Sequence, residues 1–140
     1  MQFSKQFMSM TVRFIEMIAS ETGYSFSVFD HDGYTIYATA PGRIGNFNVY
    51  AKKVMETGVD EYAVTKEKKA LHDFVDEGYL CAITYHDQKI GAFGIAGKTD
   101  IVKPVAKMAR RLFLSWINEI KYQEKLNKTE KKFQLIFEHA

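Results

Sequence analysis

The loop at residues 41–48 carries the residue types that bind an anion. Its sequence, Pro-Gly-Arg-Ile-Gly-Asn-Phe-Asn, holds Arg43 between two glycines and leads directly into a predicted helix. A guanidinium can grip a carboxylate at two points, and the free N–H groups of a helix N-terminus favour negative charge. The loop therefore predicts an anion site anchored by Arg43; the alternative is an exposed arginine in an ordinary loop. The candidate ligand-binding residues here are Arg43, Ile44, Gly45, Phe47 and Asn48.

A second stretch of this kind lies at residues 94–100, Gly-Ile-Ala-Gly-Lys-Thr-Asp. Gly97 ends a predicted strand, and Thr99 or Asp100 can cap the helix that follows. The helix N–H groups, with Lys98 or Lys103, would then favour an anion. The alternative is a plain connection from strand to helix with a capping threonine. Gly97, Lys103 and also Tyr85 are further candidates for binding a ligand.

No combination of residues in the sequence points to catalysis. The histidines at positions 31, 72, 86 and 139 are scattered, and His31 and His86 fall in predicted turns. Cys81 lies in the middle of a predicted apolar strand, which is typical of a buried structural thiol. We therefore expect no enzyme, no metal site and no bound cofactor.

Composition narrows the class of protein. The 140 residues are 46% hydrophobic and 26% charged, as in one globular domain, and the net charge of +2 is too small to indicate a nucleic-acid-binding surface. The single cysteine excludes a disulfide within the chain. Neither a secretory signal nor an apolar run of membrane-spanning length occurs, so we expect a cytoplasmic domain that does not enter a membrane.

The pattern of apolar residues predicts an α+β fold. A helix is expected up to Thr22, then a hairpin over 24–39, a short helix over 46–57 and an edge strand near 61–65. Residues 66–77 are charged and indicate at most a helical turn. A second hairpin over 79–96 and a long helix from Thr99 complete the order. This order describes an antiparallel sheet flanked by helices, with long helices at both ends.

The first helix carries a regular apolar seam that predicts a parallel homodimer through the terminal helices. The alternative is that this face packs on the chain's own sheet. The last segment, 123–140, is mostly polar and is expected to be a linker helix after a sensor domain over 1–122. The seam residues are Phe3, Phe7, Met10, Phe14 and Met17.

Four segments together resemble a known family of sensor modules. These are residues 18–24, the Asp-His-Asp-Gly turn at 30–33, the Arg-Ile-Gly of residues 43–45, and residues 89–97. In this order they are similar to the sugar-diacid recognition domain, the N-terminal input module of bacterial carbohydrate-diacid regulators. The resemblance implies a PAS-like or Cache-like sheet with a pocket for a small carboxylate, in which Arg43, Ile44 and Gly45 match the family's Arg-Ile-Gly. The family often has a histidine shortly afterwards, and here Asn48 or a neighbour stands in that place.

The end of the chain resembles the opening of a PAS domain of sensor kinases, over residues 130–140. It implies a downstream signalling domain, and it favours a signalling protein, as in a two-component system, over a transcription regulator whose next module is a helix-turn-helix. The sequence therefore predicts a ligand-sensing input domain that binds a small anionic metabolite and relays the signal through its C-terminal helix. The alternatives are a haem- or flavin-binding sensor with His72 as an axial ligand, and a dimerisation module without a ligand.

Overall fold

A computed structural model describes residues 5–56 and 58–139, with side chains for 7–56 and 58–129. The seam position Phe3 falls outside this part, and so do the side chains of residues 130–140, which resemble the opening of a PAS domain. The structure consists of two compact units, Met1–Arg110 and Arg111–Ala140. The second unit is helical where it is described, and the first unit carries the sheet.

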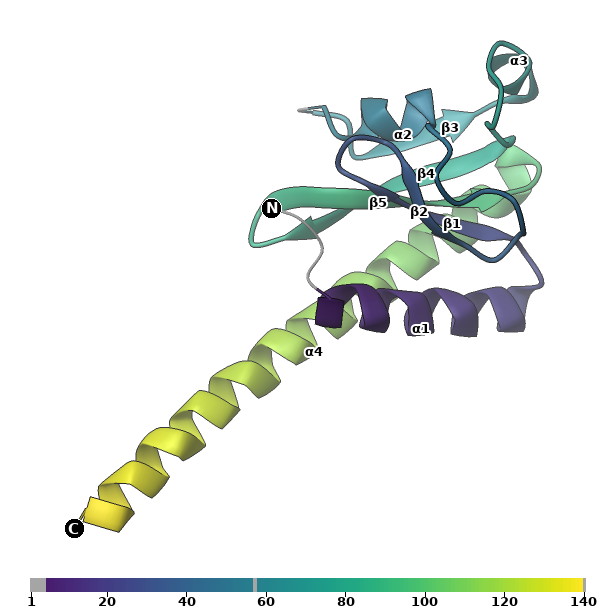
Figure 1. Cartoon of the computed structure of the whole chain (residues 1–140). Coiled ribbons are helices and arrows are strands. Elements are labelled where there is room, and N and C mark those ends of the chain that lie inside the picture. The colour runs from purple at the N-terminus through teal and green to yellow at the C-terminus, as the bar shows by residue number, and fades with distance from the viewer. Residues whose placement is uncertain (1–4, 57, 140) are drawn as a thin grey trace. The chain divides into compact units, whose positions relative to one another are not determined.

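The first unit is an α+β domain built on a five-stranded antiparallel sheet, which confirms the predicted fold class (Figure 1). The strands follow the order β2-β1-β5-β4-β3, so the two predicted hairpins lie side by side and β3 forms an edge. The elements are α1 (Lys5–Thr22), β1 (Phe26–Asp30), β2 (Thr35–Ala38), α2 (Val49–Val54), β3 (Glu61–Val64), α3 (Lys66–Lys69), β4 (Gly78–Tyr85), β5 (Gln88–Ala96) and α4 (Thr99–His139).

The alternation of side chains along the strands creates two buried faces. On one face, α2 packs against β3, β4 and β5, and Leu80 and Ala82 share a core with Tyr50, Ala51 and Val54 of that helix. On the other face lie α1 and the first turns of α4 (Figure 1). There the Cys81 thiol approaches the carbonyl of Ala106 at 3.9 Å, and the Tyr37 hydroxyl donates to Glu16 at 2.7 Å.

The tight turn between β1 and β2 forms as its Asp-His-Asp-Gly sequence predicts. The side chain of Asp30 accepts hydrogen bonds from the backbone N–H groups of Asp32 and Tyr34, at 2.9 and 3.0 Å. Gly33 adopts a φ of +91°, which costs glycine little. The turn fixes the register that places Ser27 and Phe29 on the same face as α2.

One predicted helix is shorter than expected, and the charged segment forms the helical turn expected there. The helix predicted over 46–57 begins only at Val49, because Asn48 caps it and must itself be extended. In the charged segment, α3 ends at Lys69, and the residues up to Gly78 form turns and irregular structure. Leu71 and Phe74 are exposed in that segment, and Val75 alone of its apolar residues is buried.

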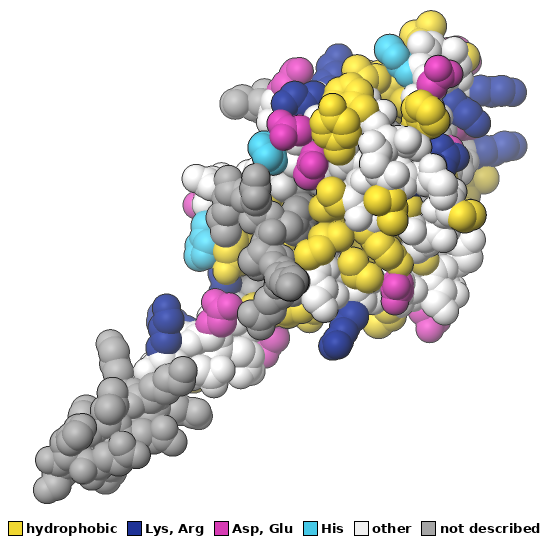
Figure 2. All heavy atoms as spheres, in the orientation of Figure 1, with side chains coloured by type: hydrophobic (Ala, Val, Ile, Leu, Met, Phe, Trp, Pro, Cys, Tyr) yellow, Lys and Arg dark blue, Asp and Glu magenta, His cyan; other side chains and the backbone are white. Residues whose placement is uncertain are grey.

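The apolar seam of α1 faces the chain's own domain at two of its positions. Phe14 is buried, and the ring of Phe7 lies 5.4 Å from that of Tyr85 on β4. Met17 is 55% exposed. The homodimer through the terminal helices stays a prediction that rests on positions such as Met17. On the face drawn in Figure 2, hydrophobic side chains of the first unit lie mostly among uncharged atoms, and basic and acidic side chains are scattered toward the edge.

Candidate functional site

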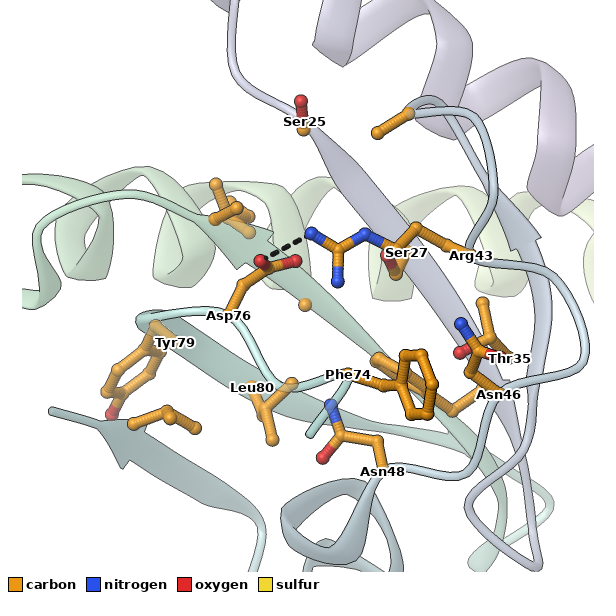
Figure 3. A pocket seen from close by; sticks show the side chains of 16 residues that line it. Ser25, Ser27, Thr35, Arg43, Asn46, Asn48, Phe74, Asp76, Tyr79 and Leu80 are labelled. Atoms are coloured by element: carbon orange, nitrogen blue, oxygen red, sulfur yellow. Dashed lines mark hydrogen bonds and ion pairs between the residues drawn. The ribbon is translucent and has the colours of Figure 1, made fainter. Parts of the chain in front are cut away.

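A pocket with both polar and apolar lining opens on the α2 side of the sheet, beside the Arg43 loop (Figure 3). Its floor is formed by β1, β4 and β5. One wall is the loop of residues 40–48 that leads into α2, and the opposite wall is the irregular segment before β4. The lining residues are Ser25, Ser27, Phe29, Thr35, Ala40, Arg43, Asn46, Asn48, Val64, Phe74, Asp76, Tyr79, Leu80, Gly94, Ile95 and Ala96.

Arg43 crosses this pocket to form an ion pair with Asp76 (Figure 3). Its Nη2 donates to Oδ1 of Asp76 at 2.8 Å, and both side chains are about one third exposed, 33% and 34%. The contact uses one nitrogen of a group that has five N–H donors. The remaining donors are therefore free to bind a second anion or a hydroxyl.

Three hydroxyl groups on the pocket wall have no protein partner among the described residues. They belong to Ser25, which directly precedes β1, to Ser27 on β1, and to Thr35, the first residue of β2. Thr35 is only 6% exposed. The three hydroxyl oxygens are accessible, and each can donate and accept a hydrogen bond, so they suit a ligand that carries hydroxyls.

The two polar atoms of the Asn48 side chain face different parts of the structure, the oxygen toward α2 and the nitrogen toward the pocket. Its Oδ1 accepts hydrogen bonds from the backbone N–H groups of Tyr50 and Ala51, at 3.0 and 3.1 Å, and thereby caps α2. The amide nitrogen is turned toward the pocket in Figure 3, and within the described part of the chain it donates to no protein group. Asn48 can therefore cap α2 and donate to a ligand at the same time.

The free volume of the pocket is small, about 30 Å³. That is the space of about one water molecule, whereas sites for small organic molecules usually measure some 300 Å³ or more. The floor is flat at Gly94, where a Cβ atom would lie 2.5 Å from a methyl group of Leu80. Because the floor is a hydrogen-bonded sheet, a ligand larger than water needs the Arg43 loop or the segment around Asp76 to move outward.

The structure brings together two of the eight candidate residues predicted from sequence: Arg43 and Asn48 line this pocket. Gly45 and Phe47 line a shallow neighbouring groove that also contains His72 and Phe74. The ring of Phe47 packs against Tyr34 at 5.3 Å. The side chain of Ile44 is 64% exposed and lines neither hollow.

The other three candidates do not line the Arg43 pocket, although Gly97 adjoins the lining residue Ala96. Gly97 directly follows β5, and its N–H donates to the carbonyl of Glu77 at 2.8 Å. Lys103 lies beside a separate surface hollow near the start of α4, with its ammonium 5.9 Å from the ring centre of Tyr79. Tyr85 is at the far end of β4 and pairs with Gln88.

Several lining residues were not among the sequence-based candidates. The serines at positions 25 and 27 alternate with aromatic and aliphatic residues along one strand, and this alternation is a signal that could have placed both on one face. Asp76 and Phe74 carried no such signal. They come from the charged segment before β4, and only the topology brings Asp76 to Arg43 across 33 positions of the chain.

A second polar cluster surrounds Glu61 on the other face of the sheet. Glu61 accepts from the Tyr79 hydroxyl at 3.3 Å and lies 3.6 Å from Arg110 and 3.9 Å from Lys107. Burial, and next the charge of Glu61, raise the pKa of the Cys81 thiol to about 12, while Arg110 and Lys107 act in the opposite direction. At neutral pH this thiol is protonated and unreactive.

The described residues contain no cluster of His, Cys, Asp and Glu that would hold a metal ion. Within that same part of the chain, every helix is too short or too polar to cross a membrane.

In a comparison with known protein families, residues 9–139 match the family of sugar diacid recognition domains. The match covers nearly the whole chain, and the chain belongs to the sugar diacid recognition family. This is a family of recognition and regulatory domains and not of enzymes, so membership indicates a sensory or regulatory role. Comparison with the curated proteins and with the solved structures gives no match.

Proposed function

We propose that this chain is a ligand-sensing input domain that binds a small hydroxylated carboxylate in the Arg43 pocket. The observation that carries the proposal is the position of Arg43 inside a pocket lined by three unpartnered hydroxyls and the Asn48 amide. A guanidinium binds a carboxylate through charge-assisted hydrogen bonds. The hydroxyl and amide groups suit the hydroxyls of a sugar acid, in keeping with the family to which the chain belongs.

The connection from the pocket to α4 supports a role in signal relay. Ala96, the last residue of β5, lines the pocket, and α4 begins three residues later at Thr99. The Thr99 hydroxyl donates to the carbonyl of Val64, another lining residue, at 3.0 Å. A ligand that changes the pocket wall would therefore act on the first turn of α4, and its differential affinity for the two arrangements would provide the signal.

A panel of matched compounds tests the proposal. The melting temperature of the purified domain is measured with D-glucarate, galactarate, adipate and D-glucitol. Adipate has the two carboxylates and the six-carbon chain without hydroxyls, and glucitol has the hydroxyls without carboxylates. We expect the two sugar diacids to raise the melting temperature most, adipate less and glucitol not at all. A domain that responds to none of the acids, or equally to glucitol, contradicts the proposal.

A further inference from the structure

The Arg43 pocket already contains a carboxylate, that of Asp76. It lies on the guanidinium at 2.8 Å, in the position where a bound acid would be expected. Two adjacent carboxylates repel each other. Binding of a ligand carboxylate to Arg43 is therefore unfavourable while Asp76 occupies the same guanidinium. The positive charge of Arg43 is thus compensated by the negative charge of Asp76 without any ligand.

We propose that Asp76 is an internal competitor that occupies Arg43 while the pocket is empty, and that a ligand carboxylate binds by displacing it. This inference rests on the proposed function. Displacement replaces one carboxylate with another, so the charge of Arg43 stays compensated throughout. Asp76 approaches through a single short contact, whereas a free carboxylate can lie in the plane of the guanidinium and accept two parallel hydrogen bonds.

The Asp76 side chain can turn outward while the backbone beside it stays in place, since the Glu77 carbonyl accepts from the Gly97 N–H at 2.8 Å. Residues 70–77 lie between α3 and β4 and form no regular strand or helix. Phe74 in this segment is 60% exposed and has a φ of +61°, a conformation that is uncommon for an aromatic residue. Val75 is buried, and the bond from Asp76 to Arg43 is the one side-chain hydrogen bond that the described residues give to this segment.

The size of the pocket agrees with displacement. About 30 Å³ is free while Asp76 and Phe74 line one side. In Figure 3 the ring of Phe74 stands beside Asn48, and the Asp76 carboxylate meets Arg43 across the opening. Outward movement of these two side chains would enlarge the pocket and leave the donors of Arg43 and Asn48 to the ligand. Because an ion pair that is one third exposed contributes little stability, the displacement costs little.

The test compares Asp76→Asn with Asp73→Asn. Asp73 lies in the same segment, is exposed and forms no ion pair among the described residues, so its replacement makes the same change in charge. The affinity for D-glucarate is measured by calorimetry. We expect Asp76→Asn to bind about twofold to tenfold more tightly than the unchanged domain, because the competing state is weakened, and Asp73→Asn to bind like the unchanged domain. Equal or weaker binding by Asp76→Asn overturns the proposal.

A second measurement requires no ligand. Phenylglyoxal modifies accessible arginines, and peptide mass mapping gives the rate at Arg43 alone. Asp76→Asn should raise this rate and Asp73→Asn should not; an unchanged rate at Arg43 overturns the internal competitor. If D-glucarate binds to none of the variants but the rate rises, the proposed ligand is wrong while the competition stands. The two failures are thereby distinguished.

Discussion

The side-chain oxygen of Asn48 accepts a hydrogen bond from the backbone N–H of Tyr50 at 3.0 Å, while the amide nitrogen of the same side chain faces the Arg43 pocket. One residue thus begins α2 and presents a donor beside Arg43. The helix and the site are joined at this position, and the two roles can be separated by substitution.

Asn48→Asp should leave α2 stable but weaken the binding of the ligand. Aspartate caps a helix as well as asparagine, so the melting temperature should hold. Its carboxylate would replace the amide donor with a negative charge that repels an acid, and the affinity for D-glucarate should fall tenfold or more. Asn48→Ala is the matched variant that should lose about 1 kcal/mol of stability through the missing cap. Unaltered binding by Asn48→Asp would show that this side chain does not face the ligand.

Gly78→Ala should destabilise the domain through a backbone clash. A Cβ atom at Gly78 would come 1.9 Å from the carbonyl oxygen of Ile95 on the neighbouring strand, and a backbone atom cannot turn aside. We expect a loss of about 3 kcal/mol in urea unfolding. Gly45→Ala provides the comparison, since its Cβ would meet nothing within 4 Å and the cost is that of a positive φ alone, about 1 kcal/mol. Equal losses for the two variants would contradict the packing described between β4 and β5.

Stability should fall in alkaline solution through Cys81. Burial, and next Glu61, raise its pKa from 9.0 to about 12 in the folded domain. The unfolded chain releases this proton first, so the stabilising contribution is complete below pH 9 and is lost as the pH rises toward 12. Tyr79, whose pKa burial and Glu61 raise to about 12, acts in the same direction.

The alkaline loss is measured as the free energy of unfolding in urea between pH 8 and 11. Cys81→Ala removes one of the three groups whose pKa is raised to about 12, the others being Tyr79 and Tyr37, and the fall of the unfolding free energy with pH should become less steep by the contribution of about one proton. A free energy that does not change across this range, in the unchanged domain, would contradict the buried position of the thiol.

Removal of residues 124–140 should leave the domain intact. The side chains from Gln123 to Thr129 are exposed, so they contribute little buried apolar area to stability. We expect the melting temperature and the affinity for D-glucarate to match those of the whole chain. A large fall in either would show that this segment belongs to the folded domain and would contradict its assignment as a linker helix.

Much of the fold could be predicted from sequence, because it depends on local patterns. The alternation along β1 and the Asp-Gly turn at position 33 define the first hairpin, and Asn48 and Thr99 stand at the starts of two helices. The limits of α3 could not be predicted, since its lysines fit a helix and a loop equally well. The seam of α1 was ambiguous for a similar reason: Phe14 is buried and Met17 is exposed, although both belong to one regular apolar pattern.

The site could be predicted only where its residues are neighbours in sequence. Arg43 and Asn48 were found because glycines and a helix start surround them. Asp76 could not be found, because its meeting with Arg43 depends on how β5 pairs with both β1 and β4, and no local pattern carries that information.

The most direct test of the account is the affinity of Arg43→Ala for D-glucarate, measured by calorimetry beside the unchanged domain and Arg13→Ala. Arg13 is an exposed arginine on α1, so its replacement controls for the loss of one positive charge. Removal of the charge-assisted contact should weaken binding tenfold or more in Arg43→Ala, and Arg13→Ala should bind as the unchanged domain does. Binding of equal strength by Arg43→Ala would contradict the assignment of this pocket as the ligand site.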